Sequence, residues 1–312
     1  MSVKSASMSA LRNLFNQLID YAGLFPPASL ELPQVVANYA RYLEEDWQWM
    51  LARLIVPALK LRELELLTTQ LPRTNKSWLI SALLPPVSDP DFARGLAEIR
   101  SFNERGRGGD HNYLVDTIEV STPSVEHLEV LVSHIPSDIS VFAELPWRDH
   151  QPHFEQIARI REKGRSDFFA KIRTGGVQTD LIPSADVVSN FIWEAKSHAV
   201  GFKATAGLHH PIRSEYRLTY ADESPIGLMH GFLNVFVAAC LVDQHKIDRE
   251  LTTELLLDSH ADHFEINQEF VGWRNYQLDS PAVRHARREF CISFGSCSFT
   301  EPIEDLQHIN IL

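Results

Sequence analysis

The sequence is poor in cysteine, in positive charge and in long hydrophobic runs, and each shortage excludes a class of protein. Its three cysteines, Cys240, Cys291 and Cys297, form no C-x-x-C pair, which is typical of reduced thiols in a cytoplasmic protein and not of a disulfide framework. The net charge is −12, so the broad basic face of a nucleic-acid-binding protein is not expected. No apolar run reaches the roughly 18 residues of a membrane span, and residues 1–15 lack the apolar core of a secretory signal.

Several familiar catalytic motifs are also missing. There is no G-x-S-x-G elbow for a nucleophilic serine, no Walker-type phosphate loop, and no H-E-x-x-H, H-x-H or Cys–His spacing of the zinc kind. The stretch DYAGLFPP (20–27) lacks the G-x-G-x-x-G turn that usually follows the first strand of a doubly wound dinucleotide-binding sheet. We therefore predict no cofactor and no metal, and we expect a small-molecule ligand, with a homo-oligomer possible.

What the sequence does contain is a regular alternation of short apolar runs and longer amphipathic stretches. Such alternation predicts parallel strands joined by right-handed helical crossovers, and eight strands in a chain of this length favour an α/β fold of the (β/α)8 barrel type. A doubly wound open sheet is the alternative. The eight strand candidates are residues 18–25, 51–58, 77–86, 113–123, 138–147, 168–176, 200–208 and 290–299.

The spacing is irregular at one place only. Residues 209–289 separate the last two strand candidates and are too long for a single crossover helix. They contain an apolar helical stretch (226–245), a second helical stretch (249–262) and an aromatic segment (263–278) that is expected to form a small hairpin. We predict one barrel domain over residues 1–312, with an N-terminal helix and an insertion at 209–289 over or beside the barrel mouth.

Charged residues late in otherwise apolar strands are the main functional signal. Chemistry in a barrel sits at the carboxyl ends of the strands, and five such residues follow this pattern: Asp20, Glu119, Glu144, Lys171 and Lys203. Burying a lone ammonium group is costly, so two lysines and three carboxylates are expected to meet and pair in one mouth. A purely structural pairing that holds strands in register is the alternative interpretation for each of them.

A second group of residues is predicted to bind the substrate. Arg173 shares a strand face with Lys171, and Thr205 shares one with Lys203, because side chains alternate along a strand. Small residues after the last two strands favour a phosphate site on backbone N–H groups, and two histidines follow Lys203 as a proton shuttle or an anion contact. The predicted substrate-binding residues are Arg173, Thr205, Gly207, His209, His210, Gly295 and Ser296.

Three short runs resemble class I aldolases with a barrel fold, of the deoxyribose-phosphate aldolase type. The run KIRTGG (171–176) is similar to the family's K-T-S-T-G run on strand six, KATAGL (203–208) to its K-A-S-G-G run on strand seven, and GSCS (295–298) to its Gly/Ser turn on strand eight. The resemblance implies that Lys171 forms a Schiff base, that Lys203 is the neighbouring cation, and that Asp20 with Glu119 or Glu144 moves protons. The chain departs from the family at Arg173, where the family has a small residue, and in the 209–289 insertion.

These observations favour an enzyme that acts through a lysine on a small anionic, possibly phosphorylated, carbonyl compound. The expected activity is that of an aldolase-like lyase or of an isomerase. A free lysine titrates near pH 10.4, and a second cation nearby lowers the pKa and activates the amine, whereas a bridging carboxylate raises it. The sequence does not decide whether the two lysines lie directly beside each other or are bridged by a carboxylate. Two alternatives remain: an enolising enzyme with magnesium on Glu119, Glu144 and Asp20, and a barrel that binds a phosphorylated metabolite without catalysis.

Overall fold

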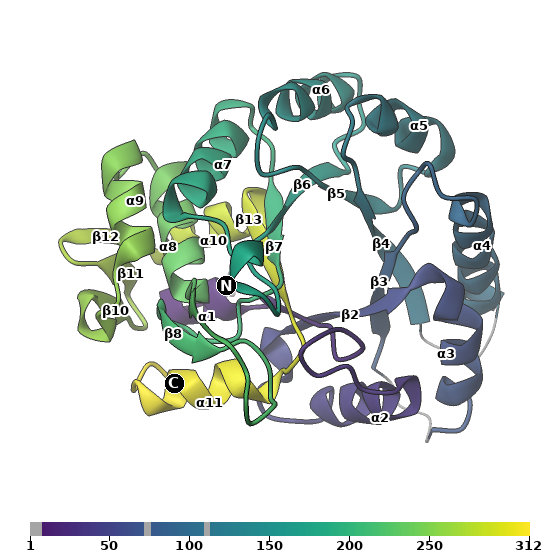
Figure 1. Cartoon of the computed structure of the whole chain (residues 1–312), viewed down its shortest axis with the longest axis horizontal. Helices are drawn as coiled ribbons and strands as arrows, with labels where there is room; N and C mark the ends of the chain where they lie inside the picture. Colours follow the sequence, from purple (N-terminus) through teal and green to yellow (C-terminus); the bar gives the residue numbers. More distant parts are fainter. Residues whose placement is uncertain (1–7, 72–75, 109–112) are drawn as a thin grey trace, which may run out of the picture.

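The computed structural model describes residues 8–71, 76–108 and 113–312. Its centre is a closed barrel of eight parallel strands in the order β1-β13-β7-β6-β5-β4-β3-β2 (Figure 1). The barrel strands are β1 Ile19–Tyr21, β2 Leu51–Pro57, β3 Trp78–Leu83, β4 Tyr113–Ser121, β5 Ser140–Glu144, β6 Phe168–Arg173, β7 Phe202–Thr205 and β13 Cys291–Ser296. The predicted barrel is confirmed, and each observed strand lies within its predicted segment.

Helices alternate with the strands and surround the barrel (Figure 1). The short helix α1 (Ala10–Phe15) precedes β1, as predicted. The helices of the outer ring as far as β7 are α2 Leu32–Tyr42, α3 Leu61–Thr68, α4 Phe92–Gly108, α5 Glu126–His134, α6 Gln151–Glu162 and α7 Ala185–Ser197, with 3-10 turns η1 Gln48–Met50, η2 Ala58–Lys60 and η3 Thr179–Leu181.

Local sequence explains several of these boundaries. Two prolines stop the segment after β3, and Ser184 caps α7, its hydroxyl accepting a hydrogen bond from the backbone N–H of Val187 at 3.4 Å. The barrel strands bury one face under these helices and the other inside the barrel, so their apolar runs are nearly continuous. Within the part of the chain that the structure describes, no helix has the length and apolar character to cross a membrane.

The segment between β7 and β13 holds two small antiparallel sheets and three helices. They are β8 Ser214–Arg217, β9 Ile226–Met229, α8 Phe232–Asp243, α9 Arg249–Leu257, η4 Ala261–His263, β10 Phe264–Ile266, β11 Phe270–Trp273, β12 Tyr276–Asp279 and α10 Ser280–Glu289. The expected hairpin at 263–278 is a three-stranded sheet. Figure 1 shows α9 and this sheet at the outer side of the molecule, away from the barrel opening.

One prediction of helical structure in this segment needs correction. Residues 226–229 are a strand, β9, because they pair with β8, and the helix starts only after Gly231. Every residue of α8 is buried within the chain itself, so α8 is a core helix and does not offer a free face for subunit contact. The last helix, α11 (Thr300–His308), was not predicted from the sequence.

Candidate active site

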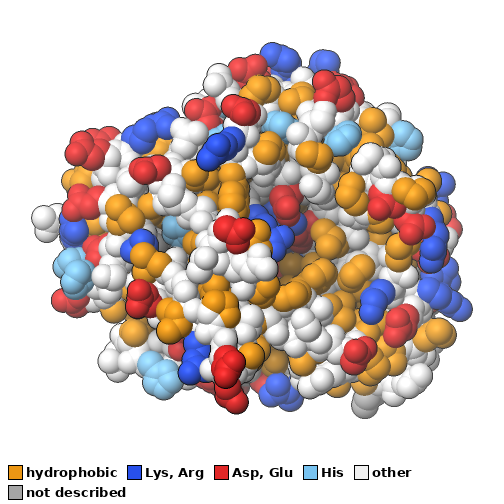
Figure 2. Space-filling model, viewed as in Figure 1, with side chains coloured by type: hydrophobic (Ala, Val, Ile, Leu, Met, Phe, Trp, Pro, Cys, Tyr) orange, Lys and Arg blue, Asp and Glu red, His pale blue; other side chains and the backbone are white. Residues whose placement is uncertain are grey.

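A cavity of about 440 Å³ opens at the carboxyl ends of the barrel strands. That volume is in the range of small-molecule sites. Its wall is mostly apolar, and Leu218 and Met229 of the insertion close one side. Figure 2 shows the hollow at the centre of this face, with basic and acidic side chains inside a largely hydrophobic surround. The predicted site residues that line it are Glu119, Glu144, Lys171, Arg173, Thr205, Gly207, His209 and Gly295.

The inward side chains below this opening form two layers. In a (β/α)8 barrel each layer draws its side chains from alternate strands. An upper layer of Ile55, Glu119, Lys171 and Gly295 comes from β2, β4, β6 and β13, and all four residues line the cavity. A lower layer of Asp20, Ser81, Phe142 and Lys203 comes from β1, β3, β5 and β7, and none of these lines it.

Lys171 is the ammonium group at the floor of the cavity. Its side chain is buried, and its Nζ lies 2.9 Å from Glu119 Oε2 and 2.9 Å from Glu144 Oε2. Glu144 is the more accessible of the two carboxylates, with a side chain that is 25% exposed. Lys171 therefore contacts one carboxylate held in the barrel and one that faces the cavity.

Lys203 lies one layer deeper and binds the same central carboxylate. Its Nζ donates to Glu119 Oε1 and to Asp20 Oδ2, both at 2.6 Å, and lies 5.5 Å from the centre of the Phe142 ring. The two lysines are paired in register on β6 and β7, but the stagger of the barrel places them in different layers. Lys203 reaches the cavity only through Glu119.

Glu119 bridges the two lysines, and this determines the protonation state of Lys171. Burial alone would lower the pKa of Lys171, but the charges of Glu119 and Glu144 outweigh burial and hold that pKa above its usual value. Burial alone would raise the pKa of Glu119, but the ammonium groups of Lys171 and Lys203 hold it far below its usual value. Of the two geometries that the sequence left open, the carboxylate-bridged one occurs.

Both oxygens of Glu119 and both oxygens of Asp20 accept hydrogen bonds from donors within the barrel. Ser81 donates to Glu119 Oε1 at 2.7 Å, and Ser293 donates to Asp20 Oδ2 at 2.7 Å. The backbone N–H of Arg53 donates to Asp20 Oδ1 at 2.9 Å. Well-packed apolar side chains in place of buried ion pairs are often as stable or more stable, by about 1–4 kcal/mol. The presence of this network at the base of a cavity therefore favours a role beyond holding strands together.

The oxygens of the two buried carboxylates are already occupied by donors. Glu119 accepts from Lys171, Lys203 and Ser81, and Asp20 accepts from Lys203 among others. A magnesium ion on these carboxylates would have to displace ammonium groups from their hydrogen bonds. The arrangement thus gives no support to the magnesium alternative.

A second polar cluster forms the wall of the cavity beside β13. His209 Nδ1 lies 3.4 Å from Ser296 Oγ, 3.7 Å from Cys297 Sγ and 3.4 Å from Glu301 Oε2. Burial alone would lower the pKa of His209, but its contacts with Cys297 and Glu301 outweigh burial and raise the pKa to about 9. His209 is therefore a cation at neutral pH, and its charge is matched by Glu301 in the first turn of α11.

The two glycine turns after β6 and β7 touch each other. A side chain on Gly175 would meet the Cα of Gly207 at 2.8 Å, and Gly207 has a φ of +75°. Both positions thus need glycine, for close approach and for a left-handed backbone. The turns place Arg173 and Thr205 at the cavity rim. Substrate binding by these two residues, and phosphate binding by the small-residue turns after β7 and β13, stay predictions.

The remaining predicted residues lie outside the cavity lining. His210 turns away, with Nδ1 2.6 Å from Asp305 Oδ2 and its ring stacked on Tyr216 at 3.6 Å. Ser296 is buried behind His209 and Gly295, and Asp20 lies in the lower layer. Sequence reasoning missed Ser81, Ser293 and Glu301. The first two were detectable only as polar residues on inward-facing strand positions, and Glu301 belongs to the unpredicted α11.

Comparison with known proteins found no matching family model and no matching curated protein. The resemblance to barrel aldolases is thus supported as far as the layout of the fold, an eight-stranded parallel barrel with alternating helices that is common to many enzymes.

Proposed function

We propose that this protein is an enzyme of the lyase type that binds a small anionic carbonyl compound in the cavity and forms a Schiff base with it at Lys171. The observation that carries the proposal is the position of the Lys171 ammonium group, at the cavity floor between one buried carboxylate and one accessible carboxylate. The barrel layout and the resemblance of the KIRTGG and KATAGL runs to aldolases add support.

The raised pKa of Lys171 is compatible with this chemistry because the overall reaction conserves charge. An ammonium group and a carbonyl give a protonated imine, one positive charge as before, and one water molecule. The same two carboxylates that stabilise the ammonium, Glu119 and Glu144, are then in place to stabilise the protonated imine. The side chain of Lys171 therefore carries one positive charge both before the reaction and as the protonated imine. It is neutral only in the short-lived free amine between these two states.

Glu144 is the residue that takes the proton when the amine attacks. Its Oε2 lies 2.9 Å from Lys171 Nζ, and its side chain is partly exposed to the cavity. Glu119 is less suited to this role because two ammonium groups keep its pKa far below the usual range. Lys203 is a positioning residue that holds Glu119 ionised from below, and Asp20 holds Lys203 in place.

We assign recognition of an anionic substituent to Arg173 at the rim of the cavity. Arg173 lines the cavity and, among the residues that the structure describes, has no carboxylate partner; its Nε donates to the backbone carbonyl of Gly175 at 3.0 Å. A guanidinium with free donors at the mouth suits a carboxylate or phosphate group of the substrate.

The proposal is tested by exchange of the proton next to the carbonyl. The purified protein is incubated in D₂O with a panel of small carbonyl compounds, among them acetaldehyde, pyruvate and dihydroxyacetone phosphate, and deuterium uptake is followed by NMR. Catalysed exchange with at least one anionic member is expected, because a protonated imine acidifies that carbon. A compound that binds in the cavity without any exchange would contradict the proposal and indicate a binding protein.

The raised pKa of Lys171 favours one second candidate, an isomerase in which the ammonium group stays protonated and stabilises an enolate while Glu144 removes the proton. The fate of the carbonyl oxygen separates the two. A Schiff base releases that oxygen as water, so turnover in water labelled with heavy oxygen should carry the label into the recovered compound faster than uncatalysed hydration does. Turnover without any enzyme-dependent uptake of labelled oxygen would favour the isomerase.

A further inference from the structure

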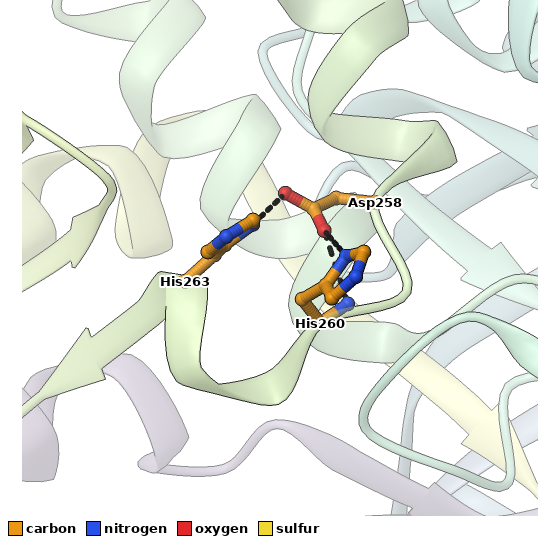
Figure 3. A group of neighbouring side chains, drawn as sticks. All are labelled: Asp258, His260 and His263. Atoms are coloured by element: carbon orange, nitrogen blue, oxygen red, sulfur yellow. Dashed lines mark hydrogen bonds and ion pairs between the residues drawn. The ribbon is translucent and has the colours of Figure 1, made fainter.

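Three side chains that commonly bind metals lie together at the end of α9, far from the cavity lining. They are Asp258, His260 and His263, and their ligand atoms all lie within 4.8 Å of one another (Figure 3). Within residues 8–71, 76–108 and 113–312, this is the one such group. We propose that Asp258, His260 and His263 form a binding site for a divalent transition metal ion of the zinc type.

The distances suit a small coordination sphere. His263 Nδ1 lies 2.7 Å from Asp258 Oδ2, and His260 Nδ1 lies 3.1 Å from Asp258 Oδ1. Ligand atoms bound to one tetrahedral zinc ion at 2.0–2.1 Å are about 3.3 Å apart. Each histidine nitrogen therefore already lies at about this distance from a carboxylate oxygen of Asp258, from Oδ2 for His263 and from Oδ1 for His260.

Binding of one metal ion by the carboxylate and both imidazoles requires the rings to turn toward each other. The two imidazole rings are tilted against each other with centroids 4.8 Å apart, and both turn the same atom, Nδ1, toward the carboxylate (Figure 3). The side chain of His260 is 66% exposed and that of His263 is 35% exposed. Both rings are therefore exposed enough for solvent and a metal ion to reach them, and their hydrogen bonds to Asp258 are the contacts that metal binding replaces.

The local backbone explains why D-x-H-x-x-H places these residues together. Asp258 is the C-cap residue that directly follows α9, and His260 is the N-cap residue of η4 (Ala261–His263). A 3-10 turn has three residues per turn, so His260 and His263 lie on the same side of it. This spacing is not one of the common zinc motifs, and it predicts a site only once the turn is known.

Asp258 is held rigidly by its surroundings, as a metal ligand needs. The indole Nε1 of Trp273 donates to its Oδ2 at 2.9 Å, and the backbone N–H of His260 donates to its Oδ1 at 3.0 Å. Asn234 of α8 donates to its backbone carbonyl at 2.8 Å. The buried carboxylate is thus fixed, and the two histidines adjust to it.

The ligand set indicates the kind of metal. Two imidazoles and one carboxylate suit zinc, cobalt or nickel better than calcium or magnesium, which prefer oxygen ligands throughout. Three protein ligands leave a fourth position for water. Arg274 is the competing cation: its Nη2 lies 3.4 Å from Asp258 Oδ2, although its Nη1 lies closer, at 2.5 Å, to Glu254.

The experiment titrates the full chain with Co²⁺ and follows the visible absorption, and then titrates it with Zn²⁺ by calorimetry. We expect one equivalent of metal per chain at this site and at least a tenfold loss of affinity in His263→Ala and in the double variant with His260→Ala. Both rings are accessible, so these variants should fold, which circular dichroism checks. His308→Ala, a change of an exposed histidine outside the cluster, should bind like the wild type.

The metal affinity of the variant Arg274→Gln distinguishes a metal site from a cluster that is held only by ion pairs. Removal of the cation beside Asp258 should strengthen metal binding severalfold. The proposal is overturned if the wild type shows no saturable binding, or if the double variant binds Co²⁺ as tightly as the wild type, since the metal would then be held by other groups.

Discussion

Lys171→Met is expected to abolish turnover of the cognate carbonyl compound, by about 10³-fold or more, while the barrel still folds. Methionine keeps the length of the side chain but has no amine to attack the carbonyl and no charge to stabilise an enolate. The loss should appear in kcat, since Arg173 and the apolar wall remain to bind substrate. Deuterium exchange by NMR measures it.

The control for this variant is Lys163→Met, which removes an exposed lysine just after α6. It should leave exchange unchanged. The fold of Lys171→Met should survive because Glu119 keeps Lys203 and Ser81 as partners, and Glu144 is partly solvated. Residual exchange near the wild-type rate in Lys171→Met would remove Lys171 from the reaction.

Lys203→Met is expected to lower the free energy of unfolding by about 3–5 kcal/mol, much more than Lys171→Met. Lys203 is fully buried, and its loss leaves Asp20 without an ammonium partner in the lower layer. Removal of one member of a buried ion pair leaves an uncompensated charge, which is the costly event. Urea unfolding followed by circular dichroism measures the difference between the two variants.

Removing the unpaired charge of Asp20 should restore part of the lost free energy of unfolding. In the double variant Lys203→Met with Asp20→Asn, the amide replaces a buried carboxylate, so the two changes should be strongly non-additive. If Lys203→Met were no less stable than Lys171→Met, or if the double variant showed simple additivity, the network would not be coupled as the distances imply.

The sequence was sufficient to predict the barrel and to bring its charged residues together. Strands alternate inward and outward, and parallel strands end on one side, so Glu119, Lys171 and Lys203 had to meet at one end of the barrel. Their order in depth was not predictable. It depends on the stagger of the strands, which no local pattern records, and this stagger is what places Glu119 between the two lysines.

Features that depend on long-range contacts were also missed. His209 was a candidate in the sequence, but of the two partners that raise its pKa, Cys297 and Glu301, the second belongs to α11, a helix that was not predicted. The metal cluster at Asp258 depends on a 3-10 turn whose spacing is not a common motif. In both cases the conformation of a short polar segment depends on the part of the fold that it packs against, so the local sequence does not predict it.

The most direct test of the account is to locate the covalent adduct. The protein is incubated with a carbonyl compound that it turns over, reduced with borohydride, digested and analysed by mass spectrometry. We expect one stable adduct, on the peptide that contains Lys171, and no adduct on Lys203, which does not line the cavity. An adduct on Lys203, or turnover without any adduct, would contradict it.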